Sequence, residues 1–357
     1  MMEVQASAPG KLVLLGDYAV LEGAPALVMA VNRHARVRIA PLAGGMCEVT
    51  APDLGLGPVR MQLGEDGAVT WQAAAADAER LRLVEQTLRG LAQDGLLPAR
   101  GRGFALHLDT SGFFDQVGGG REKLGLGSSA ALTVALASAM AVFAGRGAAT
   151  ANRRVWLERL LQLHRDFQGG QGSGVDVAAS LVGGLISYRL EAGGHPRFDP
   201  LAWPAGVHPL FVWTGTSAST AGFLGRLAQW RKTHASQYDG HMRELGAIAT
   251  AAIEAARGGR AGEFVEGAAR YADALALFGA ACGLEIFSAP HRQLAALARE
   301  CGTGYKPCGA GGGDFGVVFA QEPAALARAQ SRIAQAGFRC VPLAVDDYGL
   351  SLEYKSF

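Results

Sequence analysis

The chain opens with short, largely apolar stretches that predict β-strands, with a Pro9-Gly10 turn expected between the first two. Farther along, apolar residues such as Leu81, Val84 and Leu88 recur at helical spacing and predict amphipathic helices. At Phe104, Leu106 and Leu108, apolar residues alternate in the two-residue period of a strand. Short apolar stretches bounded by glycine or proline predict further strands. Strands are expected over 4–8, 11–15, 25–31, 35–39, 104–108, 185–190, 210–213, 304–306, 315–320, 338–345 and 349–354, and helices over 73–93, 130–143, 153–167, 221–234, 240–257, 260–281, 290–301 and 323–336.

The order of these elements predicts an α+β protein with two domains, for which 357 residues are sufficient. The polar segment 193–204 is expected to link a first domain, 1–195, to a second domain, 205–357. In the second domain a strand, several helices, two strands, a helix and closing strands follow one another. That order resembles a ferredoxin-like sandwich with additional helices.

Composition excludes several classes of protein. Hydrophobic residues make up 49% of the chain and charged residues 18%, which is typical of a well-packed protein. Lys and Arg number 33 against 32 Asp and Glu, so no basic excess is available for a nucleic acid. The five cysteines have no C-x-x-C spacing, and neither zinc nor a disulfide framework is expected. With no export signal or membrane span predicted, a cytoplasmic protein with a small-molecule substrate is expected.

Residues 123–131, Lys-Leu-Gly-Leu-Gly-Ser-Ser-Ala-Ala, form a glycine loop that leads into an apolar helix. Gly125 and Gly127 allow a tight turn, and Ser128 or Ser129 could cap the helix. A helix N-terminus presents backbone N–H groups and partial positive charge, so the loop suits a phosphate. The alternative is a loop that only caps the helix. No buried strand precedes the loop and no lysine stands before a Ser or Thr after the glycines, which excludes dinucleotide-binding and Walker motifs.

Four other positions carry candidate chemistry. Lys11, in an apolar segment, either lies along the apolar surface or directs its charge into a cleft. Asp176 follows the glycine-rich segment 169–174. It either interacts favourably with a helix dipole or places a carboxylate near the phosphate loop. The hydroxyls of 214–220 either cap a helix or bind an anionic ligand. Asp314-Phe315-Gly316 carries no prediction as a protein-kinase magnesium triad, because the chain has no H-R-D loop.

Three segments together resemble the GHMP family of small-molecule kinases: 8–22, 125–131 and 306–314, the last reading Lys-Pro-Cys-Gly-Ala-Gly-Gly-Gly-Asp. They occur in the family's order. Within the family the chain is similar to the phosphomevalonate kinase branch, on the residues 123–129, 172–179, 213–220 and 311–313. The resemblance implies an N-terminal domain like ribosomal protein S5 domain 2, a ferredoxin-like C-terminal domain, and an active site between them.

The resemblance also implies the reaction and the site. ATP and Mg²⁺ would be the cofactors, and 5-phosphomevalonate would be phosphorylated to 5-diphosphomevalonate in the mevalonate route to isoprenoids. Lys11 would neutralise the transferring phosphoryl group, and Asp176 would orient or deprotonate the acceptor. The implied ATP-binding residues are Lys123, Gly125, Leu126, Gly127, Ser128, Ser129 and Ala130, with Ser129 also reaching Mg²⁺, and the implied substrate-binding residues are Asp17, Tyr18, Ser173, Gly174, Ser217, Ser219, Thr220, Gly311 and Gly312.

Three features depart from the family pattern. Asp17 stands where the family more often has Glu, and Arg121 stands in place of a proline. The family's acidic magnesium ligand has no counterpart, because Asp166 is nearby but out of register. Two other functions therefore stay open: a kinase for mevalonate or another alcohol, and a relative that senses ATP and a metabolite without turnover. The chain is expected to be a monomer or a homodimer.

Overall fold

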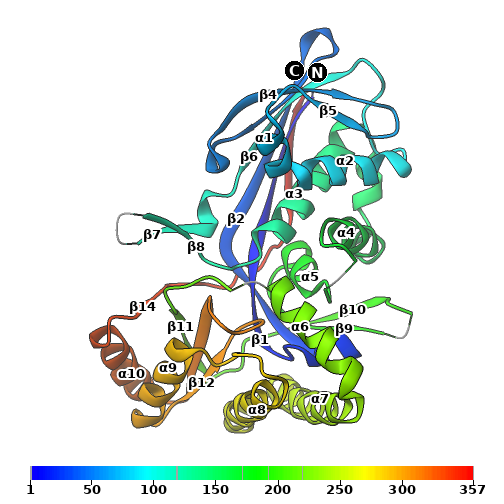
Figure 1. Cartoon of the computed structure of the whole chain (residues 1–357). Coiled ribbons are helices and arrows are strands. Elements are labelled where there is room, and N and C mark those ends of the chain that lie inside the picture. The colour runs from blue at the N-terminus through cyan, green and yellow to red at the C-terminus, as the bar shows by residue number, and fades with distance from the viewer. Residues whose placement is uncertain (1, 118–119, 171, 192, 219, 357) are drawn as a thin grey trace.

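The computed structural model describes residues 2–117, 120–170, 172–191, 193–218 and 220–356. Two long antiparallel strands, β1 (Met2–Leu15) and β2 (Ala26–Leu42), form the centre of the first lobe (Figure 1). Within the described residues they belong to a nine-stranded sheet of order β10-β9-β2-β6-β3-β4-β5, in which β1 pairs with β2 and β15. The other strands are β3 (Cys47–Ala51), β4 (Leu56–Leu63), β5 (Val69–Trp71), β6 (Gly103–Asp109), β9 (Leu185–Leu190), β10 (Pro196–Leu201) and β15 (Ser351–Ser356).

Pro9-Gly10 lies inside β1 as a register shift, not in the expected turn between two strands. Proline is tolerated at such an irregularity because no ladder hydrogen bond is needed there. A Cβ on Gly10 would lie 2.6 Å from the carbonyl oxygen of Leu126, and the N–H of Lys11 donates to that oxygen at 2.8 Å. The irregularity therefore brings the glycine loop against β1 beside Lys11.

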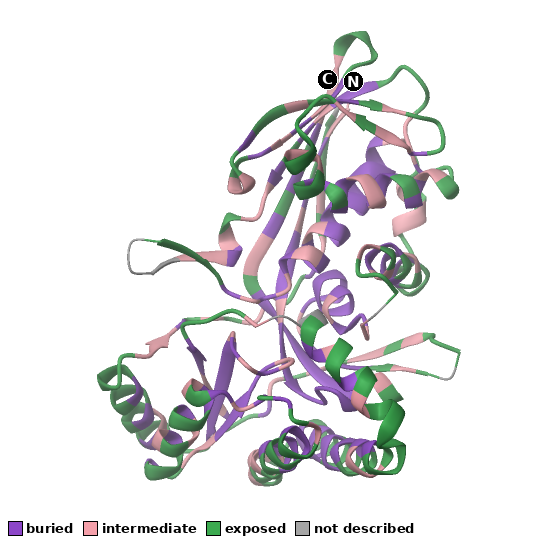
Figure 2. Cartoon of the chain, viewed as in Figure 1, coloured by how far each residue is buried: buried purple, intermediate pink, exposed green. Residues whose placement is uncertain are grey.

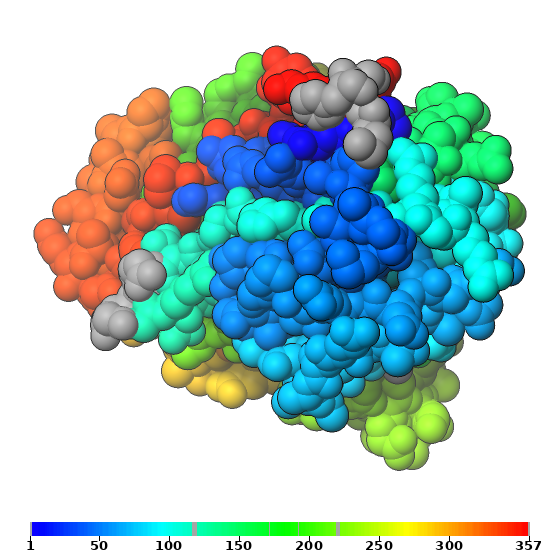
Figure 3. All heavy atoms as spheres, turned by 90° about the horizontal axis from the view of Figure 1, so that it is seen from above, coloured from blue at the N-terminus to red at the C-terminus, as the bar shows by residue number. Residues whose placement is uncertain are grey.

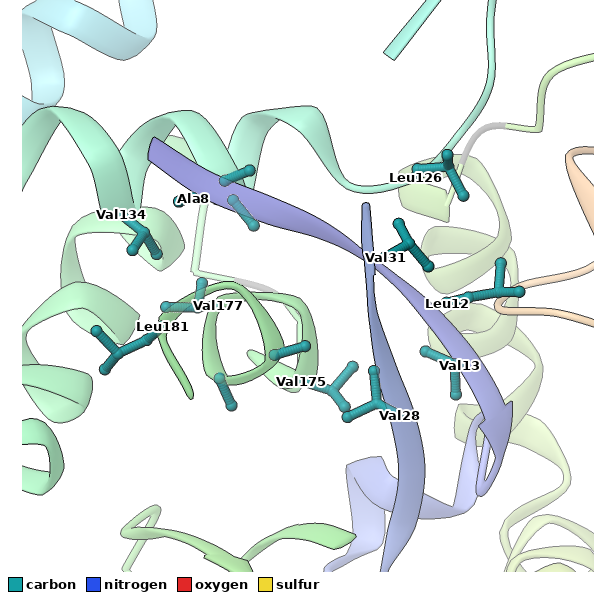
Figure 4. Close-up of a cluster of buried hydrophobic side chains, with 14 of the residues drawn as sticks. Ala8, Leu12, Val13, Val28, Val31, Leu126, Val134, Val175, Val177 and Leu181 are labelled. Carbon is teal, nitrogen blue, oxygen red and sulfur yellow. The ribbon is translucent and has the colours of Figure 1, made fainter. Parts of the chain in front are cut away.

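Helices cover one face of this sheet. They are α1 (Ala75–Arg80), α2 (Arg82–Gln93), α3 (Ser128–Phe143), α4 (Arg153–Phe167) and α5 (Val175–Val182). Figure 4 shows side chains of α3 and α5, among them Val134 and Leu181, beside apolar side chains of β1 and β2. Helix α3 is buried on nearly all sides because it lies between the sheet and the other helices, which accounts for its charge-free sequence.

The second lobe is a four-stranded antiparallel sheet of order β12-β13-β11-β14, which confirms the ferredoxin-like arrangement. Leu294 of α9 and Ile333 of α10 pack on one face, and Phe264 of α8 meets Phe319 on the other. The central strands are consequently buried on both faces (Figure 2). The elements are β11 (His208–Trp213), β12 (Gly304–Pro307), β13 (Phe315–Ala320), β14 (Arg339–Cys340), α6 (Thr220–Thr233), α7 (Ala235–Arg257), α8 (Ala261–Cys282), α9 (Ala289–Glu300) and α10 (Pro323–Gln335).

Four expectations on the elements are corrected. The helix expected over 73–93 is interrupted at Leu81. The expected linker contains β10, which pairs with β9, and the strand expected over 338–345 spans only two residues. The last strand, placed in the second domain by its position in the sequence, pairs with β1 of the first sheet and covers an edge that would otherwise be open. Viewed from above in Figure 3, the N-terminal and C-terminal segments accordingly lie side by side on the surface.

Candidate active site

A cavity of about 620 Å³ lies where β1, the glycine loop and the loops of the second lobe meet. Many of the predicted site residues line it, together with residues that the sequence did not single out. The predicted lining residues are Lys11, Asp17, Tyr18, Lys123, Gly125, Gly127, Ser128, Ser129, Ser173, Gly174, Asp176 and Ser217, and the others include Arg82, Phe167, Ala218, Cys308, Gly309, Ala310 and Asp314.

Four of the remaining predicted residues, Leu126, Ala130, Gly311 and Gly312, do not line the cavity. Leu126 and Ala130 are completely buried in the core of the first lobe. A Cβ added to Gly311 would meet Ile286, and one added to Gly312 would meet Phe223. Ser219 lies outside the described residues, and Thr220 begins α6.

The glycine loop is shaped by backbone conformations that favour glycine. Gly125 and Gly127 have φ of +70° and +78°, and Gly127 is the N-cap of α3. The cap makes no side-chain hydrogen bond, so the expected capping by a serine is not found. Ser129 Oγ instead lies 3.2 Å from Nε2 of the buried His164. The first N–H groups of a helix have no partner within the helix, and here they begin at the cavity.

Lys11 extends its side chain across the glycine loop. A Cβ on Gly127 would lie 3.2 Å from both Cγ and Cε of Lys11. Glycine at this position therefore leaves room for the Lys11 side chain and also permits the turn. The result is a cation at the mouth of the phosphate loop, in the cavity rather than along the apolar surface.

Asp176 is the second residue of α5 and lies in its first turn, after the N-cap Gly174 and Val175. Its Oδ1 accepts a hydrogen bond from the N–H of Val177 at 2.9 Å. The preceding loop is fixed because the Tyr188 hydroxyl donates to the carbonyl of Ser173 at 2.7 Å. The carboxylate thus both stabilises the start of a helix and lines the cavity that contains Lys11.

Asp17 and Tyr18 hold the second lobe against β1. The carboxylate of Asp17 forms a buried ion pair with Lys306 of β12, and the Tyr271 hydroxyl donates to the Asp17 carbonyl at 2.5 Å. Burial raises the pKa of Asp17 despite the nearby ammonium group. The Tyr18 hydroxyl donates to the carbonyl of Ala310 at 2.6 Å. These two polar groups, expected to bind substrate, are thus engaged within the protein.

Asp314 is a residue of the second lobe whose carboxylate lies against the glycine loop. A Cβ on Gly125 would overlap the Asp314 carboxylate, whose Oδ1 accepts from the N–H of Ala218 at 3.3 Å. Burial raises the pKa of Asp314 to about 6, although Lys11 and Lys123 act in the opposite direction.

Hydrogen bonds fix the loops around Asp314. The Thr214 hydroxyl, for which the sequence left helix capping and ligand binding open, donates to the carbonyls of Asp314 and Thr216 at 3.0 and 3.2 Å. The Ser217 hydroxyl donates to the carbonyl of Lys123 at 2.7 Å and so joins the two lobes. The hydroxyls of Thr214 and Ser217 therefore hold the loops of the protein together.

His291 supports the glycine-rich loop from behind. Its Nε2–H donates to the carbonyl of Gly313 at 3.0 Å, and its Nδ1 accepts from the Tyr305 hydroxyl at 2.7 Å. This tautomer follows because a carbonyl can only accept. Burial lowers the pKa of His291 to about 4, so the ring is neutral at physiological pH.

Comparison with known proteins identifies the family. The profile of the GHMP kinases N-terminal domain matches residues 83–184. A phosphomevalonate kinase of Streptomyces sp. (strain CL190) is 30% identical over 94% of this chain and 95% of its own length. The chain belongs to the GHMP kinase family. A mevalonate kinase of Thermococcus gammatolerans is 29% identical to this GHMP kinase over 65% of the chain and 63% of its own length.

The fold is shared more widely than the sequence. A Streptococcus pneumoniae phosphomevalonate kinase, solved with phosphomevalonate and AMPPNP, is similar to this GHMP kinase with a TM-score of 0.73 at 18% identity, over 96% of this chain and 99% of that one. The two-domain fold expected from the sequence is confirmed. The protein is therefore an ATP-dependent phosphotransferase for a small molecule, among the GHMP kinases of the mevalonate pathway. Within the described residues, none of the helices has the length and apolar character that spanning a membrane requires.

Proposed function

We propose that this GHMP kinase transfers the γ-phosphoryl group of ATP to the phosphate of 5-phosphomevalonate. The observation that carries the proposal is the presence of Lys11 and Lys123 in one cavity with the phosphate loop. A phosphate acceptor brings two highly charged groups together, and their repulsion in a partly dry site is large unless cations lie beside them. A neutral alcohol as acceptor would need fewer cations in the site. The full-length similarity to a phosphomevalonate kinase supports the same choice.

In this mechanism the protein mainly positions ATP and the acceptor and neutralises the charge on the transferring phosphoryl group. The N–H groups at the start of α3 bind the phosphates of ATP, and Lys11 neutralises charge on the transferring phosphoryl group. An oxygen of the acceptor phosphate bonds to the γ-phosphorus, the bond from that phosphorus to the bridging oxygen breaks, and ADP leaves. Asp176 orients the acceptor, which is already anionic near pH 7 and needs little deprotonation.

Mg²⁺ is the expected companion of ATP in this reaction. It commonly binds one or two protein oxygens together with substrate phosphates and water. The cavity suits such a cation because the Ser128 and Ser129 hydroxyls and carboxylates line it. In the described part of the chain, no group of three or more His, Cys, Asp or Glu side chains is arranged for a metal. Ser129 would hold the cation with the nucleotide, where it supplies charge neutralisation.

Mevalonate is the second candidate acceptor, because mevalonate kinases are among the relatives. A steady-state assay of ADP release with MgATP distinguishes the two, using 5-phosphomevalonate, mevalonate and several sugar alcohols. We expect the highest kcat/KM for 5-phosphomevalonate. A higher value for mevalonate would assign the enzyme to alcohols, and binding without turnover of any acceptor would favour a sensor.

A further inference from the structure

We propose that Asp314 is the protein carboxylate that faces the divalent cation accompanying ATP. The inference rests on the proposed function. It concerns a residue of the second lobe, whose carboxylate lies against Gly125 of the phosphate loop in the same cavity as Lys11 and Ser129. Neither lobe alone would then contain all the groups around the cation.

The backbone of Asp314 is held in an uncommon conformation. Its φ of +57° lies in the left-handed region, which is costly for residues other than glycine. The conformation is fixed from both sides. The Asp314 N–H donates to the Thr216 carbonyl at 2.7 Å, and the Asp314 carbonyl accepts from the Thr214 N–H at 2.9 Å. This conformation directs the carboxylate to Gly125, where a residue with ordinary φ would follow a different path.

The other carboxylates near the cavity have different surroundings. Asp17 is buried in its ion pair with Lys306, and Asp176 accepts a hydrogen bond from its own helix. Asp166, close in sequence to the position of the acidic ligand in the family, is exposed, accepts from the Gln162 side chain at 2.7 Å and does not line the cavity. Of these four carboxylates, Asp314 is the one beside the glycines of the phosphate loop.

A carboxylate in this place repels the phosphates of ATP unless a cation lies between them. Oxygen ligands from a carboxylate and from phosphates are the set that Mg²⁺ prefers. The carboxylate would then make nucleotide binding depend on Mg²⁺. If Asp314 were instead only a counter-ion of Lys11 and Lys123, it would weaken nucleotide binding equally with and without the cation.

Calorimetry with a non-hydrolysable ATP analogue, with and without Mg²⁺, separates these cases. In the wild-type protein we expect Mg²⁺ to strengthen binding at least tenfold. In Asp314→Asn we expect the Mg²⁺-free analogue to bind a few-fold more tightly and most of the strengthening by Mg²⁺ to disappear. Asp166→Asn, the same substitution on α4, should behave as wild type. Mn²⁺ paramagnetic resonance of the ternary complex should change with Asp314→Asn and not with Asp166→Asn.

Asp314→Gly is a second variant that accepts the left-handed backbone without strain, so a loss of folding does not obscure the result. Retention of the full Mg²⁺ effect in both Asp314 variants would overturn the inference, as would equal tightening with and without Mg²⁺. If the wild-type protein binds no nucleotide with Mg²⁺, the proposed function itself fails. If it binds and the Asp314 variants keep the Mg²⁺ effect, only the inference fails.

Discussion

The ammonium group of Lys306 and the carboxylate of Asp17 form an ion pair whose side chains are 1% and 2% exposed. Lys306 comes from β12 of the second lobe, and Asp17 follows β1 of the first. The pair therefore joins the two lobes beside the cavity that Asp17 lines. Removing one partner of such a pair leaves an uncompensated charge in the interior.

Lys306→Met should lower the free energy of unfolding by about 3–5 kcal/mol, because Asp17 loses its partner. Urea denaturation measures the loss. Arg332→Met is the matched control, since Arg332 and Glu300 form a pair with side chains 54% and 57% exposed, and it should cost less than about 1 kcal/mol. Adding Asp17→Asn to Lys306→Met should recover part of the stability. Equal small losses in Lys306→Met and Arg332→Met would contradict the account.

Gly127→Ala should reduce kcat by at least tenfold, because the new Cβ meets the side chain of Lys11. Gly145→Ala provides the control: Gly145 has nearly the same φ, +77°, but nothing lies within 4 Å of the added Cβ. Both variants should lose about 1 kcal/mol of stability through backbone strain. Steady-state kinetics and thermal melts separate the effects. The expected role of Gly127 fails if both variants retain wild-type kcat.

Asp176→Asn should lower kcat with 5-phosphomevalonate by about tenfold, less than the 10²–10⁴-fold that general-base catalysis commonly contributes. The reason is that an anionic acceptor needs orientation more than deprotonation. The same variant assayed with mevalonate, which must lose a hydroxyl proton, should lose proportionally more of whatever turnover the wild type shows. Equal proportional losses with both acceptors would count against the orienting role.

His291 should make the protein less stable in acid. The pKa of the ring is about 4 in the folded protein and near 6.5 when unfolded. Between these values the unfolded chain binds a proton that the folded chain does not, so stability falls as the pH drops through this window. The loss attributable to His291 should be about 2 kcal/mol at pH 5.

His291→Gln tests this dependence, because glutamine can donate to the Gly313 carbonyl but does not titrate. Urea denaturation of both proteins at pH 7.5 and pH 5 shows how much the free energy of unfolding of each protein changes with pH. Buried carboxylates such as Asp314, whose raised pKa acts with the opposite sign, are present in both proteins and cancel. Parallel stability profiles for the two proteins would show that His291 does not carry the effect.

Most elements could be predicted from the sequence because hydrophobic periodicity and glycine placement are local signals. The pairing of β15 with β1 could not, since it joins the two ends of the chain. Local pattern also misplaced Pro9-Gly10, where a proline and a glycine inside a strand have the same appearance as a turn.

Members of the candidate site that follow one another in motifs could be predicted to lie together, and members from distant segments could not. Lys11, Asp176 and five residues of the glycine loop line one cavity. Nothing in the sequence indicates that Lys306 is paired inside the protein or that His291 binds the carbonyl of Gly313. Asp314 ends the segment 306–314 that resembles the family and begins the tripeptide Asp314-Phe315-Gly316, but neither pattern assigns it a role. Its place beside Gly125 depends on the packing of the second lobe against the first.

The most direct measurement is a competition between acceptors in one solution. Equimolar 5-phosphomevalonate and mevalonate, with the protein, ATP and Mg²⁺, would be followed by ³¹P resonance at early times. The account predicts that the signals of a new diphosphate, P–O–P, appear first while mevalonate remains unchanged. Accumulation of a new phosphate monoester from mevalonate before any diphosphate other than ADP would contradict it.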